Sequence, residues 1–360
     1  MDKRYRRCAC GLLAGVLLLL TAAAAMVYAV DPACYYRMPA EGEAVFFNER
    51  YQSAGLARNV KADTVLIGTS MAANYRPSAI GAAFDTSGGR ITLPDGYISE
   101  FDRVMDVLFR KQEPERVIFV LDMNILTRDD SGVTDAMPEY LYNRNPVDDV
   151  RYLLNKDALY YSFFVLKNRE WGTTETLDES FVWDEGIWWN HITALAGYAR
   201  PEPTGESLSA DAYLENVRRN LAVIESWITE HPDTKFEIFL SPYSMLFWDK
   251  TARLGQTEAV LAAMELTCET LVRHENAALY GYLMDTEFVD DLDNYCDHLH
   301  HSTEMGDRVL AKLAAGEGRL TAENTAETLA NWRQFVVDYD YEKFWDQAFW
   351  EEWNAARAKT

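Results

Sequence analysis

The chain reads Asp63-Thr-Val-Leu-Ile-Gly-Thr-Ser-Met-Ala-Ala-Asn74 at the point that decides its fold. The short apolar run Val65 to Ile67 predicts a buried strand that ends at Gly68. Ser70 then stands at the carboxyl end of a strand, where open α/β sheets bind their ligands. Ser70 is therefore a candidate nucleophile. The alternative is that it only caps a following helix, because serine is a preferred residue at that position.

A second short segment, Asp297-His298-Leu299-His300, supplies the partners that a nucleophilic serine needs. Asp297 and His300 are three residues apart and can face the same side of a turn or helix. The carboxylate can then orient the imidazole, which acts as a base toward a serine. The order Ser, Asp, His is one of the orders in which this triad occurs. The sequence thus predicts a catalytic triad of Ser70, Asp297 and His300.

A strand followed by Gly-Thr-Ser near the start, with Asp-x-x-His near the end, resembles the SGNH/GDSL hydrolase superfamily. The likeness is strongest to membrane-anchored, extracytoplasmic members from Gram-positive bacteria, and it covers most of residues 27–310. Three further segments add to it: Pro138–Tyr142, Asp149–Asp157 and Phe236–Trp248. The resemblance implies a flavodoxin-like, three-layer α/β fold with a parallel sheet.

The resemblance also implies an oxyanion hole, to which the backbone N–H of Ser70 and a glycine after the second strand contribute. Residues 83–86 read as a weak strand that stops at Ser87, and Gly88 and Gly89 follow it. Glycines at such a place let backbone N–H groups approach a reacting atom closely. Gly88 and Gly89 match by position, and the alternative is a plain turn.

Asn124 is the candidate for the asparagine that the superfamily adds to the oxyanion hole from a third block. It follows residues 116–121, the clearest buried strand in the chain. The usual Gly-x-Asn-Asp wording is absent, so the alternative is that Asp122 and Asn124 simply end the strand.

Charge and hydropathy predict an anchored protein with no nucleic-acid partner. The chain has 34 basic and 57 acidic residues, a net charge of −23, which repels polyphosphate. A basic tail, residues 1–7, precedes the uncharged run 8–30, which is long enough to cross a hydrocarbon core of about 30 Å. Basic residues before the span place everything after residue 30 outside the cytoplasm. A cleaved signal peptide is the alternative, and we favour a retained transmembrane anchor, because the segment after it reads like the start of a folded domain.

Downstream of the anchor, alternating patterns predict strands at 64–67, 116–121, 235–240 and 279–283, and helices at 95–111, 209–231 and 258–274. We expect an SGNH-like domain over 31–315, with an aromatic-rich insertion at 127–210, and a C-terminal aromatic helical extension over 316–360. The aromatics of the insertion either stack on sugar rings or pack the insertion onto its own domain.

No cofactor is expected. His298, His300 and His301 lack a second cluster of metal ligands, so the sequence predicts no metal site. Cys268 and Cys296 either form a disulfide or remain free thiols.

These features favour a serine esterase or O-acyltransferase anchored in the cell membrane, with its catalytic domain outside the cytoplasm. The expected substrate is an acylated cell-wall polysaccharide or teichoic acid. The alternative is a catalytically silent SGNH-fold scaffold or glycan-binding protein of cell-envelope assembly.

Overall fold

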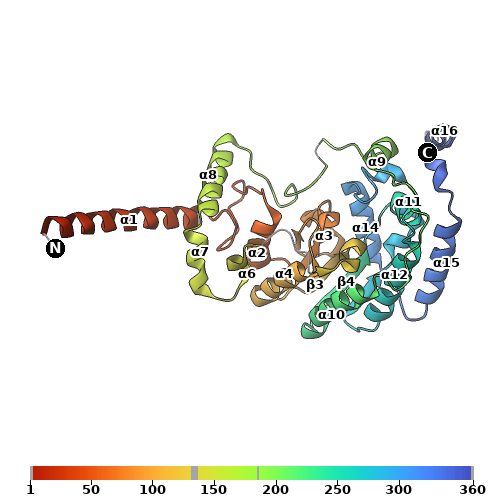
Figure 1. Ribbon diagram of the computed structural model, residues 1–360, viewed down its shortest axis with the longest axis horizontal. Helices are drawn as coiled ribbons and strands as arrows, with labels where there is room; N and C mark the ends of the chain where they lie inside the picture. Colours follow the sequence, from red (N-terminus) through yellow and green to blue (C-terminus); the bar gives the residue numbers. More distant parts are fainter. Residues whose placement is uncertain (1–2, 131–136, 185, 358–360) are drawn as a thin grey trace. The chain divides into compact units, whose positions relative to one another are not determined.

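The computed structural model describes residues 3–130, 137–184 and 186–357 as a mixed α/β protein with a six-stranded, mostly parallel sheet (Figure 1). The strand order is β2-β1-β3-β4-β5-β6. β1 and β2 are parallel, as are β4 and β5, whereas β6 runs antiparallel to β5. The strands are β1 (Thr64–Gly68), β2 (Gly88–Thr92), β3 (Arg116–Leu121), β4 (Lys235–Leu240), β5 (Ala277–Tyr280) and β6 (Arg319–Leu320). The predicted α/β class and parallel sheet are confirmed.

Two compact units divide the chain. Unit 1 comprises Met1–Ile118 and Asp130–Trp183, and unit 2 comprises Phe119–Asp129 and Asp184–Thr360. The helices of unit 1 are α1 (Lys3–Val30), α2 (Glu49–Asn59), α3 (Pro77–Phe84), α4 (Ile98–Lys111), α6 (Glu139–Tyr142), α7 (Asp149–Leu153) and α8 (Lys156–Trp171). Those of unit 2 are α5 (Met123–Thr127), α9 (His191–Gly197), α10 (Leu214–Glu230), α11 (Met245–Arg253), α12 (Thr257–Leu271), α13 (Thr286–Val289), α14 (Thr303–Ala315), α15 (Thr325–Asp338) and α16 (Gln347–Arg357).

In unit 1, every residue of β1 is buried, which explains why its sequence is apolar without alternation. α4 packs against α2 with a stripe of buried residues at helical spacing, Phe101, Val104, Met105 and Leu108. α3 begins with Pro77 at its first turn, where the missing N–H of proline costs no hydrogen bond.

The prediction of a strand at residues 83–86 is wrong. α3 continues through Phe84, and Asp85 ends it in the left-handed region with φ 52°. The second strand begins only at Gly88, where an added Cβ would lie 2.0 Å from the carbonyl oxygen of Pro77. Gly88 is therefore required by the close approach of β2 to α3.

In unit 2, β4 has the predicted bounds, and the helix predicted at 209–231 is α10, which begins at Leu214. Its apolar stripe is buried. The strand predicted at 279–283 is shifted: β5 ends at Tyr280 because residues 282–284 form a 3₁₀ turn. It is also not the last strand, since β6 follows it.

α1 is the one helix in the described part of the chain that is long and apolar enough to cross a membrane. It has 28 residues, a mean hydropathy of 2.4 in its best window, and 6% of that window is buried. A signal sequence near the N-terminus passes the same test. The end of α1 packs against α7 and α8 within unit 1, and Val27 is completely buried there.

The predicted insertion over 127–210 contains α6 to α9, and residues 131–136 and 185 of it lie outside the described residues. Beyond Gly316 the chain forms β6, α15, a 3₁₀ turn at 341–345 and α16. Trp332 and Phe344 of this segment are buried in unit 2. Some of the aromatic side chains after Gly316 therefore belong to the hydrophobic core of unit 2.

Candidate catalytic site

Ser70 lies directly after the carboxyl end of β1 and begins a 3₁₀ turn over residues 70–72. The capping position of this turn belongs to Thr69, whose side-chain oxygen accepts a hydrogen bond of 3.2 Å from the Met71 N–H. The cap role that could have explained Ser70 is thus taken by its neighbour. Ser70 itself is half-buried.

Arg90, in the middle of β2, holds the chain that follows Ser70. Its guanidinium donates to the carbonyl oxygen of Tyr75 at 3.0 Å and to that of Ala73, and it also donates to the Ser180 hydroxyl at 3.0 Å. Burial lowers the pKa of Arg90 to about 10. Sequence reasoning missed this residue, although a lone arginine beside apolar Ile91 in a strand is a usable signal.

Gly88 and Gly89 are not brought to Ser70. In the parallel register of β1 and β2, Gly88 pairs with Thr64 and Gly89 with Val65, at the amino end of β1. Ser70 follows the opposite, carboxyl end of the same strand. Both glycines serve packing, since a Cβ on Gly89 would lie 2.9 Å from the side chain of Val60.

Asp297 and His300 form the predicted pair in unit 2. One carboxylate oxygen of Asp297 lies 2.7 Å from His300 Nδ1, and the other accepts the N–H groups of Leu299 and His300, each at 2.7 Å. Burial raises the pKa of Asp297, but these hydrogen bonds outweigh burial and hold the pKa below its usual range. The turn therefore presents an ionised carboxylate that fixes the orientation of the His300 ring.

The other two histidines of this segment are placed differently. His298 Nε2 lies 3.2 Å from Lys250 Nζ, and His301, 2% exposed, directs Nδ1 to the carbonyl oxygen of Ser302 at 3.0 Å. Burial lowers the pKa of each imidazole to about 4. Both rings are thus neutral near pH 7.

Asn124 belongs to the first turn of α5, directly after β3. Its Nδ2 donates to the Tyr243 hydroxyl at 3.4 Å, and that hydroxyl in turn donates to Asp122. The Asp122 side chain also accepts the Asn124 N–H at 2.8 Å, so it caps α5. Asp122 therefore ends β3 and caps α5, as the alternative reading of this residue proposed. The side chain of Asn124 is instead oriented by its hydrogen bond to Tyr243.

The loop after β4 connects the Asn124 turn to the Asp297–His300 turn within unit 2. Besides the contacts of Tyr243, Ser244 Oγ donates to the carbonyl oxygen of His298 at 3.0 Å. Tyr295 Oη donates to the carbonyl oxygen of Pro242 at 2.7 Å. These bonds give both turns a common support.

A second histidine–carboxylate pair, missed by sequence reasoning, lies elsewhere in unit 2. His191 Nδ1 is 2.7 Å from Asp293, and its ring stacks on Trp350 of α16 with centroids 3.9 Å apart. Trp353 and Arg357 of α16 also donate to Asp293. The two residues are 102 apart in sequence, so spacing gave no signal. The coverage by α16 indicates a packing role.

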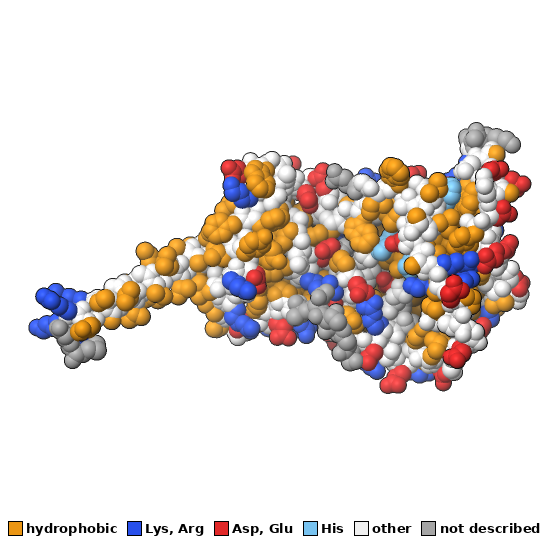
Figure 2. Space-filling model, turned by 45° about the horizontal axis from the view of Figure 1, so that its top comes forward, with side chains coloured by type: hydrophobic (Ala, Val, Ile, Leu, Met, Phe, Trp, Pro, Cys, Tyr) orange, Lys and Arg blue, Asp and Glu red, His pale blue; other side chains and the backbone are white. Residues whose placement is uncertain are grey.

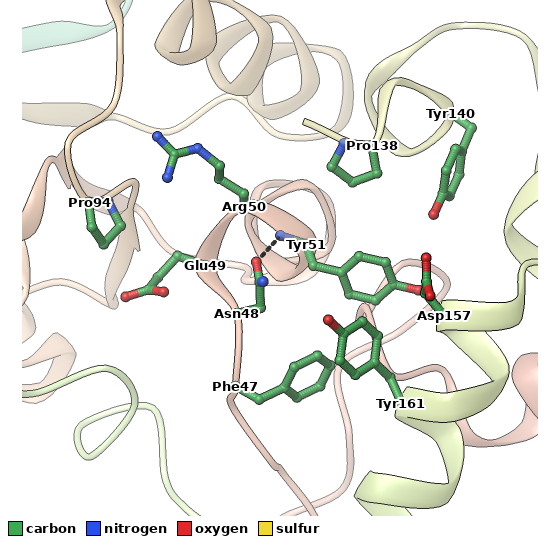
Figure 3. A pocket seen from close by; sticks show the side chains of 10 residues that line it. All are labelled: Phe47, Asn48, Glu49, Arg50, Tyr51, Pro94, Pro138, Tyr140, Asp157 and Tyr161. Atoms are coloured by element: carbon green, nitrogen blue, oxygen red, sulfur yellow. Dashed lines mark hydrogen bonds between the residues drawn. The ribbon is translucent and has the colours of Figure 1, made fainter. Parts of the chain in front are cut away.

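A pocket of about 500 Å³ lies in unit 1 (Figure 3). It is formed by the start of α2, the loop after β2, and α6 and α8 of the predicted insertion; its lining residues are Phe47, Asn48, Glu49, Arg50, Tyr51, Pro94, Pro138, Tyr140, Asp157 and Tyr161. Tyr51 is 6% exposed, and its ring packs on that of Tyr161 with centroids 5.0 Å apart. Arg50 is occupied by a bidentate ion pair with Glu100. The pocket thus offers aromatic faces and acceptor oxygens, a combination suited to sugar rings.

Cys268 and Cys296, whose pairing the sequence left open, are both free thiols. Burial raises the pKa of each to about 12, so neither is a reactive thiolate near neutral pH.

Comparisons with known proteins assign no family. No family model matches the chain, and no curated protein matches it. A solved structure described as "The structure of a putative platelet activating factor from Streptococcus pneumonia" aligns with a TM-score of 0.39 and 12% identity, over 74% of this chain and 90% of that chain. A likeness of this strength does not establish a common fold.

Proposed function

We propose that the protein is a serine esterase or O-acyltransferase of the SGNH type, anchored by α1, with the chain that follows α1 outside the cytoplasm. Its substrate would be an acylated glycan or teichoic acid of the cell envelope.

The observation that carries this proposal is the Asp297–His300 pair. A carboxylate that accepts the Nδ1 proton fixes the tautomer in which Nε2 can act as a base, and it stabilises the imidazolium that forms. The two additional N–H donors hold Asp297 ionised and in place.

Ser70 is assigned the nucleophile. Its Oγ would form a bond to the ester carbonyl carbon while His300 takes the hydroxyl proton. The alcohol then leaves with that proton, and an acyl-enzyme remains. Water releases the acid in hydrolysis, or a hydroxyl of an acceptor polymer takes the acyl group in transfer. The N–H of Ser70 and the Asn124 amide are the proposed oxyanion donors, and Gly88 and Gly89 are not.

Two features support an envelope glycan as the substrate. α1, preceded by basic residues, favours an extracytoplasmic position for the units. The pocket of Figure 3 offers rings of Tyr140 and Tyr161 beside the carboxylate of Asp157, which suits a sugar ring with hydroxyl groups at its edge.

The test is covalent labelling of the full-length protein with a fluorophosphonate probe. We expect wild type to be labelled, Ser70→Ala not to be labelled, and the control Ser78→Ala, which changes an exposed serine of the same unit, to be labelled like wild type. Circular dichroism verifies that each variant is folded. A folded wild type that resists the probe would support the silent scaffold instead.

A further inference from the structure

α7 and α8 form a layer at the end of α1. Both helices pack against α1, and both lie across its axis where α1 enters unit 1 (Figure 1). Asp31, the first residue after α1, accepts the Tyr152 hydroxyl of α7 at 2.9 Å, and that hydroxyl accepts the Ala33 N–H at 3.1 Å. The layer is therefore tied to the end of the apolar helix.

The exposed side of α8 carries large aromatic side chains among its charged ones. Its buried face is made of small or medium residues, Ala158, Ser162 and Val165. At 100° per residue, Tyr160, Phe163 and Trp171 project from the opposite side. These three side chains are 65%, 55% and 69% exposed. Large aromatic groups thus share the exposed side of α8 with Lys156, Lys167 and Glu170.

The apolar surface extends beyond α8. Val150 and Leu154, in and directly after α7, are 50% and 43% exposed. Figure 2 shows apolar side chains along α1 and again over the surface next to its attached end. Lys167 and Arg169 of α8 are paired with carboxylates, Lys167 with Glu170 at 2.8 Å and Arg169 with Glu43 at 3.6 Å. Exposed tyrosine and tryptophan side chains next to an apolar span are typical of the membrane interface.

We propose that α7 and α8 rest on the surface of the membrane that α1 spans, with Tyr160, Phe163 and Trp171 inserted at the level of the lipid headgroups. The proposal depends on α1 being a retained span and does not depend on the catalytic role of Ser70. The lipid bilayer is the occupant because α1 leads into it and because α7 and α8 lie across α1 at that end.

The test uses full-length protein reconstituted in vesicles that contain lipids brominated near the headgroup, which quench tryptophan fluorescence on contact. We expect Trp171→Phe to lower the quenched fraction of the emission. The matched control is Trp188→Phe, which removes a tryptophan that is 77% exposed in unit 2. It should raise the quenched fraction slightly, because it removes emission that the lipid does not quench.

An unchanged quenched fraction in Trp171→Phe, or an equal fall in both variants, would overturn the membrane-resting surface. Alkaline carbonate extraction separates this result from failure of the anchor. Wild-type protein that stays with the membrane after extraction confirms that α1 is a retained span, on which the proposal depends. Wild-type protein that is released shows that α1 is not such a span, and this overturns the proposal.

Discussion

The carboxylate of Asp297 lies 2.7 Å from His300 Nδ1 within a single turn of the chain. The spacing alone predicted this pairing, because residues three apart in a turn are close whatever the rest of the fold does. The catalytic role of the pair remains a prediction. The contacts that support the site could not be predicted in this way. Tyr243 reaches Asp122 and Asn124 across 121 and 119 residues, and no periodic pattern encodes such a distance.

Asp297→Asn should preserve the fold and reduce ester turnover by about 10⁴-fold, the loss that the same change causes in a serine protease of unrelated fold. The amide can no longer fix the productive tautomer of His300. Hydrolysis of a model acetyl ester, at matched circular dichroism, measures the effect. Wild-type turnover in this variant would remove Asp297 from the mechanism.

His300→Ala should abolish labelling by the fluorophosphonate probe, because no other ring nitrogen takes the Asp297 hydrogen bond. His298→Ala is the matched control and should keep most of the labelling, since its ring contacts Lys250. His301→Ala should be less stable, because its ring is buried, so its labelling is compared per folded molecule. Equal losses in all three would indicate a structural cluster of histidines.

Stability should fall as the pH drops from about 6.5 to about 4. The pKa of His301 is lowered to about 4 by burial, whereas the unfolded chain takes up a proton near 6.5. In this window the unfolded state binds more protons, so unfolding becomes easier by about 3 kcal/mol for His301 alone. Urea unfolding across this range measures the slope, and His301→Asn should flatten it. A variant with the wild-type slope would exclude His301 as its source.

At the scale of the elements, the two six-residue strands were predicted well and the shorter ones were not. β3 has its predicted bounds because burial on both faces leaves a continuous apolar run. β4 also has its predicted bounds, although Lys235 is exposed and Glu237 is only partly buried, because its other four residues are apolar and buried. β6 has only two residues, Arg319 and Leu320, and exists only because β5 is beside it. α10 starts five residues late because Ser209 bonds to Asp211 in a turn before the helix.

Gly88 was misassigned because a glycine required for chemistry and one required for packing look the same in a sequence. Gly88→Ala should destabilise the protein by about 3 kcal/mol, since the new Cβ would meet the backbone of Pro77 and Gly81. Urea unfolding measures this cost, with Ser78→Ala as a control in the same segment. Probe labelling per folded molecule should stay at the wild-type level. Normal stability combined with lost labelling would instead return Gly88 to the oxyanion hole.

At the scale of the whole molecule, both units should fold without the apolar helix. A fragment of residues 31–360 lacks α1 but keeps Asp31 and its hydrogen bonds to the N–H groups of Tyr35, Tyr36 and Arg37. We expect this fragment to be soluble in mild detergent and to unfold cooperatively in a thermal melt followed by circular dichroism. Recovery only as aggregate, under several conditions, would show that α1 is needed for folding.

The four hydrogen bonds that Asp31 accepts make the end of α1 a stiff joint, where many anchored proteins have a flexible linker. A flexible linker lets a domain sweep a hemisphere above the bilayer, with a reach that grows with its length. Under the proposal that α1 spans the membrane, a stiff joint confines the rest of unit 1 to one height and one tilt above it. The pocket of unit 1 would then sample a thin layer parallel to the membrane, in which the local concentration of a membrane-proximal polymer is high and that of distant material is negligible. Replacing this joint with a long glycine-serine linker would let the pocket reach farther from the membrane and would lower the local concentration of membrane-proximal polymer around it.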